Sequence, residues 1–404
     1  MKRSVCWLLI FAIVLIFILP AGAAQTADFA DAADIRNDCA VQMLVDLELI
    51  VGDQSGNFRP NAPITRAETA KLIACLCTDT PEASGWNAFA DTAGSWAKDY
   101  IAYCAAQGIV GGSGGYFRPQ DDVTAQELAK MLLVVVGFDA QQYTGAGWAG
   151  RVNTDAAQNG LYHDFTGSYD APITRDDACL LIYNAMQCPA VDGENPDGTA
   201  RYVLDGLMNR KTYLEVRFDA VRYSGVLTGN ECADLTQAGG TLAQGATKLE
   251  GHREFDVSSG LDLVGHQTAV YVRSGKILGA PAASVQERTL EIRDTSKLEK
   301  ISAGNGFRLT AQTEYFKNYV PASASALQEL PEGAVVQLLD HDGDGSVDVA
   351  LILSGFESVV TDTDPLTLRG GRRAEPFSAS DPPVSGESVT CIEVGGTLYA
   401  LPVR

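Results

Sequence analysis

The chain contains 404 residues, with 51 acidic against 30 basic side chains, and its formal net charge is −21. Proteins that bind nucleic acid neutralise phosphates with clustered Lys and Arg, so a chain this acidic, with no basic cluster, is not expected to bind DNA or RNA. A hydrophobic content of 46% excludes wholesale disorder and allows sizeable cores. At roughly 100–200 residues per domain, the length predicts two or three domains.

Residues 1–24 are typical of a secretory signal peptide. Lys2 and Arg3 precede an apolar run over residues 5–19, and small residues at 21–24 follow it. A run of this length is short for a membrane span, which needs about 20 apolar residues, although an uncleaved anchor is the alternative. We therefore expect an exported protein with no membrane span after cleavage.

Three copies of one sequence pattern follow. In the first copy, which begins at Phe29, the triplets Phe-Ala-Asp, Ile-Val-Gly and Phe-Arg-Pro precede a Thr-x-x-Glu motif. The second copy repeats these landmarks in the same order from Phe89, and a looser third copy ends near Asp177. So many shared landmarks in one order indicate internal repeats, which we assign to residues 25–84, 85–142 and 143–188.

Each repeat predicts two helices joined by a structured loop. The threonines at 65, 124 and 174 are each followed three residues later by an acid, the pattern of a capping box at a helix start. Apolar residues at helical spacing come next, and Gly, Asn and Pro fill the loop between the helices. One such unit is too small to bury its apolar face, so we expect the three to form one all-α domain.

The stretch from about Asp28 to Cys188 resembles three consecutive S-layer homology repeats. The family's Thr-Arg-Ala-Glu motif begins at Thr65, and its Trp-Ala opening of the first helix occurs at Trp96 and Trp148. The resemblance implies a pseudo-threefold helical bundle whose grooves bind pyruvylated secondary cell-wall polysaccharide. It also implies a secreted protein held without covalent attachment on the cell wall or S-layer of a Gram-positive-type bacterium.

The same resemblance implies a set of glycan-binding positions. They are Asp31, Arg66, Asp91, Trp96, Trp148 and Arg175. A guanidinium is planar and permanently charged, so it suits an acidic glycan, and a helix N-terminus adds a favourable dipole. The second repeat has Ala125 at the arginine position, and the first repeat lacks the tryptophan. The alternative is that the Thr and Glu positions are helix caps and the Trp positions are core; we accept it for Thr65 and Glu68.

Eight of the nine cysteines follow the signal peptide. An even count in an exported protein suggests disulfides, but several of them stand where amphipathic helices bury small residues. We therefore expect free, buried thiols, with Cys179–Cys188 or Cys232–Cys391 bridges as the alternative.

The second half changes to a β pattern. Residues 189–209 are interpreted as a linker with a short helix at 202–208, because Pro, Gly, Asp and Asn are frequent there. Beyond it, apolar runs flank Ser274-Gly275 and Gly395-Gly396, as in hairpins. Further strands are expected at 214–218, 221–227, 290–293 and 335–339. The prediction is a multidomain chain, α then β, with all-β barrel or sandwich modules at 210–283 and 284–404.

An acidic turn between two apolar strands predicts a calcium site. Its oxygen-bearing residues are Asp340, Asp342, Asp344, Ser346 and Asp348. Carboxylates at alternate positions with Gly345 at the sixth position reproduce the first part of a calcium loop. Leu351 stands at the twelfth position, so the turn is not an EF-hand. A polar turn without metal is the alternative, but crowded carboxylates repel one another unless a cation such as Ca²⁺ neutralises them.

These observations favour a non-enzymatic envelope protein. The helical repeats would bind a secondary cell-wall polysaccharide or another peptidoglycan-linked glycan, and the acidic β region would serve as a surface-structural or interaction module. The alternative is an anchored cell-wall or polysaccharide hydrolase with its chemistry in residues 210–404. A third hypothesis is a subunit that self-assembles into a lattice.

Overall fold

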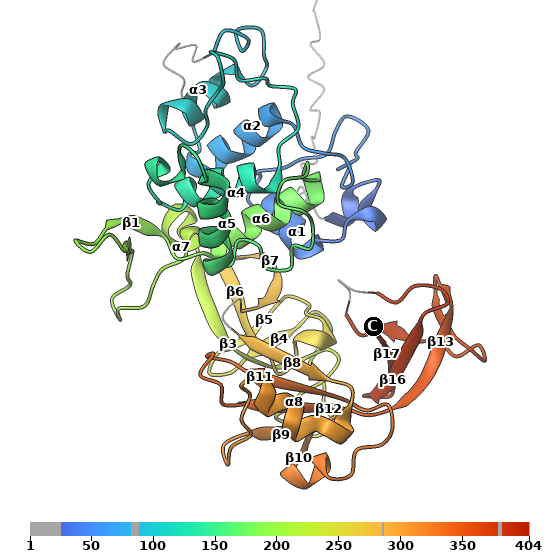
Figure 1. Ribbon diagram of the computed structural model, residues 1–404. Helices are drawn as coiled ribbons and strands as arrows, with labels where there is room; N and C mark the ends of the chain where they lie inside the picture. Colours follow the sequence, from blue (N-terminus) through green and yellow to red (C-terminus); the bar gives the residue numbers. More distant parts are fainter. Residues whose placement is uncertain (1–25, 82–88, 285–286, 379–381, 404) are drawn as a thin grey trace, which may run out of the picture.

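The structure, a computed structural model, describes residues 26–81, 89–284, 287–378 and 382–403. The predicted signal peptide lies outside these residues. A helical bundle comes first and a β region follows, so the predicted order of α then β is confirmed (Figure 1). Within the described ranges, no helix combines the length and the apolar character needed to cross a membrane.

The bundle is built from a pair of helices in each repeat. These are α1 (Asp38–Asp46), α2 (Arg66–Cys77), α3 (Lys98–Ala106), α4 (Ala125–Val135), α5 (Trp148–Gln158) and α6 (Arg175–Gln187). The second helix of each pair begins as predicted. Thr65 and Glu68 form a complete capping box at the start of α2, and α4 begins in the same way. At α6 the Thr174 hydroxyl accepts the Asp177 N–H.

A closed ring of backbone hydrogen bonds joins the three repeats. The N–H of Ile64 donates to Ile173 O at 3.1 Å, Val123 N–H donates to Ile64 O at 3.1 Å, and Ile173 N–H donates to Val123 O at 2.9 Å. Each of these residues lies just before a capped helix, and all three are buried. The ring gives the bundle the pseudo-threefold arrangement that the resemblance implied.

The β region contains three five-stranded sheets, where the sequence predicted two modules. Sheet 1 has the order β5-β4-β3-β6-β7, sheet 2 the order β10-β9-β12-β11-β8, and sheet 3 the order β14-β13-β16-β17-β15. Leu227 of sheet 1, Leu339 of sheet 2 and Ile392 of sheet 3 belong to one buried cluster. Residues of all three sheets therefore contribute to one buried cluster.

The strands have the following bounds. Sheet 1 consists of β3 (Val221–Asn230), β4 (Thr247–Leu249), β5 (Glu254–Phe255), β6 (Gln267–Arg273) and β7 (Lys276–Ala283). Sheet 2 consists of β8 (Arg288–Ile292), β9 (Glu314–Lys317), β10 (Val320–Ala322), β11 (Val335–Asp340) and β12 (Val349–Leu353), with α8 (Leu298–Gly304) beside it. Sheet 3 consists of β13 (Phe356–Thr363), β14 (Leu366–Leu368), β15 (Glu375–Pro376), β16 (Ser388–Val394) and β17 (Thr397–Pro402). Both predicted hairpins, β6–β7 and β16–β17, are confirmed.

Two local predictions are wrong. Residues 214–218 were expected to form a strand but belong to helix α7 (Tyr213–Phe218), which Thr212 and Glu215 cap with another capping box. The helix expected at 202–208 is absent from this described segment, where β1 (Val191–Glu194) pairs with β2 (Ala200–Tyr202). The predicted linker is therefore a structured hairpin that projects from the side of the molecule (Figure 1).

The bundle and sheet 1 share one core. Tyr271 of β6, Leu278 of β7 and Phe218 of α7 are buried in the same cluster as the bundle helices. The Tyr213 hydroxyl donates to Leu76 O at 3.2 Å, and Arg217 Nε donates to Cys77 O at 2.8 Å, so α7 also caps the carboxyl end of α2. The position of sheet 1 is thus fixed relative to the bundle.

The cysteines agree with the expectation of free thiols. All eight that lie in the described part of the chain are unpaired. Burial raises the pKa of Cys39 to about 11 and that of Cys188 to about 12, so neither thiol ionises near neutral pH.

Asp46 tests the junction between the bundle and sheet 1. Its side chain is 6% exposed. One carboxylate oxygen accepts the Gly279 N–H at 2.8 Å, and the other forms an ion pair with Lys276 Nζ at 2.9 Å. We predict that Asp46→Ala lowers the free energy of unfolding by about 1–3 kcal/mol, because it leaves a buried N–H without a partner. Asp46→Asn keeps an acceptor and should cost less. Urea denaturation measures both; equal stability of wild type and Asp46→Ala would contradict the prediction.

Candidate functional site

Three junctions, one per repeat, bring the predicted site residues together. In each, the start of a capped helix packs on the Phe-Arg-Pro loop, or its third-repeat equivalent, of a neighbouring repeat. Junction A joins α6 to the first repeat, junction B joins α2 to the second, and junction C joins α4 to the third. The bonds are Arg175 N to Ala62 O and Asp176 N to Pro60 O in A, Arg66 N to Asp121 O and Ala67 N to Pro119 O in B, and Ala125 N to Ala171 O and Gln126 N to Tyr169 O in C.

Asp31 and Asp91 hold the loops in place. The Asp91 carboxylate accepts the N–H of Phe117 at 2.9 Å and that of Arg118 at 2.7 Å, and Asp31 makes the equivalent pair of bonds in the first repeat. Arg118 has a φ of 59°, a left-handed conformation that is unfavourable for a residue with a side chain. These aspartates therefore position the loop, and their oxygens are engaged within the protein.

The two motif arginines occupy equivalent places. Arg66 Nε donates to Phe117 O at 2.8 Å, and its guanidinium carbon lies 4.4 Å from the centre of the Phe117 ring. Arg175 Nε donates to Phe58 O at 2.9 Å, with its guanidinium 5.4 Å from that ring. Each arginine thus crosses from its own helix onto the loop of the neighbouring repeat.

The two arginines differ in the partners that the protein gives to their guanidinium groups. Arg175 Nη1 lies 3.0 Å from Glu68 Oε1, in an ion pair whose arginine side chain is only 20% exposed. Arg66 Nη2 instead donates to a backbone oxygen, Gly111 O, at 2.9 Å. Burial lowers the pKa of Arg66, and Glu127 acts in the opposite direction. Arg66 therefore carries its positive charge into junction B without a direct carboxylate partner among the described residues.

Junction B also carries an open pocket. Trp96 is 59% exposed. Together with Asp91, Gly94, Ser95, Pro119 and Gln120 it lines a pocket of about 270 Å³. The alternative that Trp96 belongs to the hydrophobic core is therefore excluded. Trp148 is half-buried, with Lys130 Nζ 5.5 Å from its ring, so junction C has an aromatic residue and a lysine but no motif arginine.

Arg36 is a charged residue that the sequence prediction missed. It stands in the first repeat where Trp96 stands in the second. Its Nη2 lies 3.3 Å from Asp177 and its Nε lies 3.6 Å from the buried Asp176, both at the start of α6. Burial raises the pKa of Asp176, although Arg36 and Asn37 act to lower it. Junction A is therefore bridged by the protein's own ion pairs, and aligning the repeats position by position could have revealed this.

The predicted metal ligands meet at the turn between β11 and β12. One carboxylate oxygen from each of Asp340, Asp342 and Asp348 lies within 4.8 Å of the other two. Asp340 is fully buried, accepts the N–H of Gly345 at 2.9 Å and lies 3.3 Å from Arg288. Three hard oxygen donors at this spacing fit a calcium ion, while Arg288 already neutralises part of the charge.

The remaining predicted ligands close the turn. Asp344 Oδ1 accepts the Ser346 N–H, and Asp342 Oδ1 accepts the Asp344 N–H at 3.1 Å. The hydrogen bond from Ser346 lowers the pKa of Asp344. Asp348 Oδ2 accepts the His341 N–H at 2.8 Å. The turn thus has the backbone bonds of a stable polar turn as well as convergent carboxylates.

A buried polar cluster near this turn joins sheets 1 and 2. His266, just before β6, hydrogen-bonds through Nδ1 to Glu287, just before β8. The other Glu287 oxygen accepts the Gln267 N–H at 2.6 Å, and His341 Nε2 lies 3.7 Å away from it. Burial acts to raise the pKa of Glu287, but His266 and the hydrogen bonds outweigh it, so the pKa is lowered. Glu287 therefore stays ionised and ties the two sheets together.

The S-layer homology domain matches the chain at residues 29–70 and 88–129. These ranges lie within the first two repeats and include the helix start and the loop of junction B. The assignment of the third repeat rests on its sequence pattern and on its place in the closed ring of hydrogen bonds. The chain therefore carries S-layer homology repeats, and the recognition made from the sequence is confirmed.

Several curated proteins are similar to the chain. A surface-layer 125 kDa protein of Lysinibacillus sphaericus is 29% identical over 328 residues, which cover 72% of this chain and 27% of that protein. An S-layer protein of Bacillus thuringiensis subsp. finitimus is 26% identical over 35% of this chain and 17% of its own length. Exoglucanase XynX of Acetivibrio thermocellus is 23% identical over 42% of this chain and 17% of its own. The chain thus spans about a quarter or less of these relatives.

Asp91 allows a test of the loop by pH. Burial acts to raise the pKa of Asp91, but the hydrogen bonds from Phe117 and Arg118 outweigh it and the pKa is lowered. A lowered pKa contributes stability above the unfolded-state pKa of about 3.9, and this is lost as pH falls through the folded-state value. We predict that Asp91→Asn lowers the free energy of unfolding by about 1 kcal/mol at pH 7 and by less at pH 3.

The matched control is Asp99→Asn, which changes an exposed acid in the same repeat. Urea denaturation at the two pH values gives both differences. A loss of stability in Asp91→Asn that is equal at pH 7 and pH 3 would contradict the role of the charged carboxylate.

Proposed function

We propose that the protein anchors itself to the cell wall by binding an acidic secondary cell-wall polysaccharide, of the pyruvylated type, at the junctions of its helical bundle. Its acidic β region then acts as a surface-structural or interaction module. The observation that carries this proposal is junction B. There the exposed Trp96 lines an open pocket, and Arg66, at the start of α2, donates to Phe117 O of the loop that supplies Pro119 and Gln120 to the same pocket.

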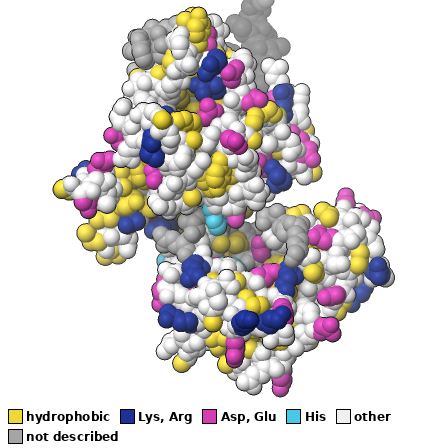
Figure 2. Space-filling model, in the orientation of Figure 1, with side chains coloured by type: hydrophobic (Ala, Val, Ile, Leu, Met, Phe, Trp, Pro, Cys, Tyr) yellow, Lys and Arg dark blue, Asp and Glu magenta, His cyan; other side chains and the backbone are white. Residues whose placement is uncertain are grey.

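The protein is located at the cell wall or S-layer of a Gram-positive-type bacterium, as its S-layer homology repeats and its S-layer relatives indicate. Such an envelope presents anionic polymers to any exported protein. With a formal net charge of −21, the chain is repelled by a polyanion as a whole. Figure 2 shows acidic side chains scattered over the face in view rather than gathered in one patch. Recognition therefore depends on a few placed cations.

The chemistry of junction B fits an acidic sugar. A guanidinium has five N–H donors, and the protein engages those on Nε and Nη2 of Arg66, which leaves donors for a carboxylate. The neighbouring exposed indole of Trp96 offers a flat apolar face against which the C–H face of a sugar ring can pack. The loop is fixed by Asp91, so little conformational entropy is lost on binding.

The three junctions are expected to contribute unequally. Junction B has the arginine, the exposed tryptophan and the pocket. Junction A has Arg175, but Glu68 pairs with it, and Arg36 replaces the tryptophan and pairs with α6. Junction C has Trp148 and Lys130, with Ala125 in place of the arginine. We infer that junction B binds most of the glycan and that junction A adds a weaker contact.

A hydrolase function for residues 210–404 is a second candidate. It rests on the similarity of part of the chain to exoglucanase XynX and to an amylopullulanase of Thermoanaerobacterium thermosulfurigenes, of which the matches cover 17% and 9%. Release of reducing sugars from peptidoglycan or plant polysaccharides, or of free amino groups from peptidoglycan, by the full chain would support it, and release of neither would contradict it.

Calcium binding at the acidic turn is a separate proposal. Asp340, Asp342 and Asp348 would supply carboxylate oxygens, and Asp344 and Ser346 lie on the same turn. The ion would neutralise the carboxylates that Arg288 does not reach and would tie β11 to β12. It would act on the stability of the β region rather than on glycan binding.

The first prediction from the proposed function concerns wall binding. We expect the double variant Arg66→Ala/Arg175→Ala to bind purified cell walls at least about tenfold more weakly than wild type, because charge-assisted hydrogen bonds to the polymer are lost. The second repeat has Ala125 at the equivalent position, and its helix α4 begins there with a complete capping box. Co-sedimentation with walls measures the binding.

The control is Arg253→Ala/Arg369→Ala, which removes the same charge from the β region. Walls stripped of secondary polymer by mild acid or hydrogen fluoride should bind wild type poorly. Unchanged binding to stripped walls, or equal losses in both double variants, would contradict the proposed glycan binding.

The second prediction concerns calcium. An extracellular site of this kind has an affinity of about 10⁻⁴–10⁻³ M, so 10 mM Ca²⁺ should raise the melting temperature of the full chain by a few degrees. Asp342→Ala/Asp344→Ala removes carboxylates without touching the buried Asp340 and should abolish the rise. Differential scanning calorimetry measures it, with Mg²⁺ as the control ion. The same rise in the variant, or no rise in wild type, would contradict the site.

A further inference from the structure

The hairpin at residues 189–212, here called the arm, forms a second candidate binding surface outside the bundle. It contains β1 and β2 and projects from the side of the molecule (Figure 1). Its base is fixed, because Val191 N–H donates to Val136 O at 2.8 Å and Ala190 N–H donates to Lys211 O at 2.9 Å. The contact is close: a Cβ at Gly137 would meet Val191 O at 1.9 Å. The base of the arm is therefore anchored to the bundle.

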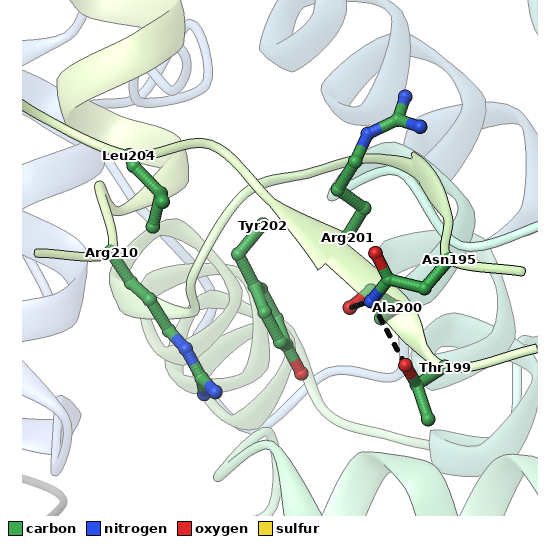
Figure 3. A pocket seen from close by; sticks show the side chains of 7 residues that line it. All are labelled: Asn195, Thr199, Ala200, Arg201, Tyr202, Leu204 and Arg210. Atoms are coloured by element: carbon green, nitrogen blue, oxygen red, sulfur yellow. Dashed lines mark hydrogen bonds between the residues drawn. The ribbon is translucent and has the colours of Figure 1, made fainter. Parts of the chain in front are cut away.

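One face of the arm carries an open depression of about 540 Å³. Figure 3 shows the ring of Tyr202 in the middle, with Arg210 on one side and Asn195 and Thr199 on the other. Leu204 closes the pocket beside Arg210. The lining thus combines an aromatic ring, a guanidinium, an amide and a hydroxyl within one concave surface.

Arg210 is the charged group of this pocket. Its guanidinium carbon lies 4.0 Å from the centre of the Tyr202 ring. Within the described part of the chain it forms no ion pair with a carboxylate. Arg201, the residue before Tyr202 in β2, has an acidic partner, because its Nε lies 2.7 Å from Asp192 Oδ1. A stacked arginine without an acidic partner, in a strongly acidic protein, is poised for an external anion.

A tight turn fixes the position of Arg210. The Asp205 carboxylate accepts the N–H groups of Leu207 and Asn209, each at 2.8 Å, and Leu204 pairs with Arg210 across the turn. Met208 is held at a φ of 68° within this turn. The stacked pair of Arg210 and Tyr202 is consequently preformed, which reduces the entropy lost on binding.

The opposite wall is polar. Asn195 Nδ2 donates to Thr199 Oγ1 at 2.9 Å, and Thr199 Oγ1 donates to Asp197 at 2.7 Å. The side-chain oxygen of Asn195 is an acceptor of the kind that pairs with sugar hydroxyls. The ring of Tyr202 between these groups and Arg210 suits the apolar C–H face of a pyranose, which stacks on aromatic rings.

We propose that the arm pocket binds an acidic saccharide unit. The sugar packs on the face of Tyr202 opposite Arg210, Asn195 and Thr199 bind its hydroxyls, and Arg210, stacked on the other face, supplies the positive charge that attracts the carboxylate. As a further contact with the wall polymer, this inference rests on the proposed function. Because the base of the arm is anchored to the bundle, occupation of both sites by one polymer would raise the apparent affinity above that of junction B alone.

The test uses methyl glucuronide as the acidic probe and methyl glucoside as the neutral one. Binding is followed by saturation-transfer NMR with the full chain carrying Arg66→Ala/Arg175→Ala, so that the bundle arginines do not contribute. We expect the glucuronide to bind this background at least about tenfold more tightly than the glucoside. Adding Arg210→Gln should remove this preference, and adding Tyr202→Ala should weaken both probes.

The matched control is Lys211→Gln, which removes a charge from the same arm outside the pocket lining. Equal binding of the two probes, or equal loss from Lys211→Gln and Arg210→Gln, would overturn the arm site. Neither result would affect the wall-binding test of Arg66 and Arg175 in the otherwise wild-type chain, so failure of the arm site is distinguishable from failure of the proposed function.

Discussion

The ring of hydrogen bonds among Ile64, Val123 and Ile173 is the constraint on which the rest of the bundle depends. Each of these residues directly precedes the capping threonine of a helix, so the ring brings three positively polarised helix ends onto three neighbouring loops. The motif position that follows each cap must then lie at a junction between repeats. A single repeat cannot form such a site, because its helix and its loop serve different junctions.

The three equivalent junctions differ in the polar side chains that they carry. The protein engages Asp91 in shaping the loop, whereas Trp96 is exposed at junction B and Arg66 is half-buried there without a carboxylate partner among the described residues. Substitution of tryptophan by Arg36 turns the corresponding place in junction A into an internal ion pair with α6. The repeat therefore supplies the same backbone three times, and single side chains decide whether a junction is open to a ligand or closed by the protein. An acidic protein can bind an acidic polymer in this way, through local charges rather than net charge.

Local sequence patterns predicted the bundle well, because the residues that cap each helix and start its apolar pattern lie within a few positions of each other. The capping boxes and the helices they begin could be placed from sequence, and Thr212 with Glu215 carries the same signal, which should have identified α7 in place of a strand. The division of the β region into three sheets was not predictable in this way, because it depends on contacts between distant residues such as Leu227 and Ile392. Arg36 and Arg210 were missed for a related reason. The role of an exposed arginine depends on the residues that the fold places beside it.

The most direct test of the central claim is fluorine NMR of the full chain labelled with fluorotryptophan, titrated with the acidic polysaccharide released from cell walls. The Trp96 resonance is assigned by Trp96→Phe. The account predicts that this resonance shifts more than that of Trp148, and that removing the acidic groups from the polymer abolishes the shift. A Trp96 resonance that stays unchanged at saturating polysaccharide, or a shift that persists with the neutral polymer, would contradict it.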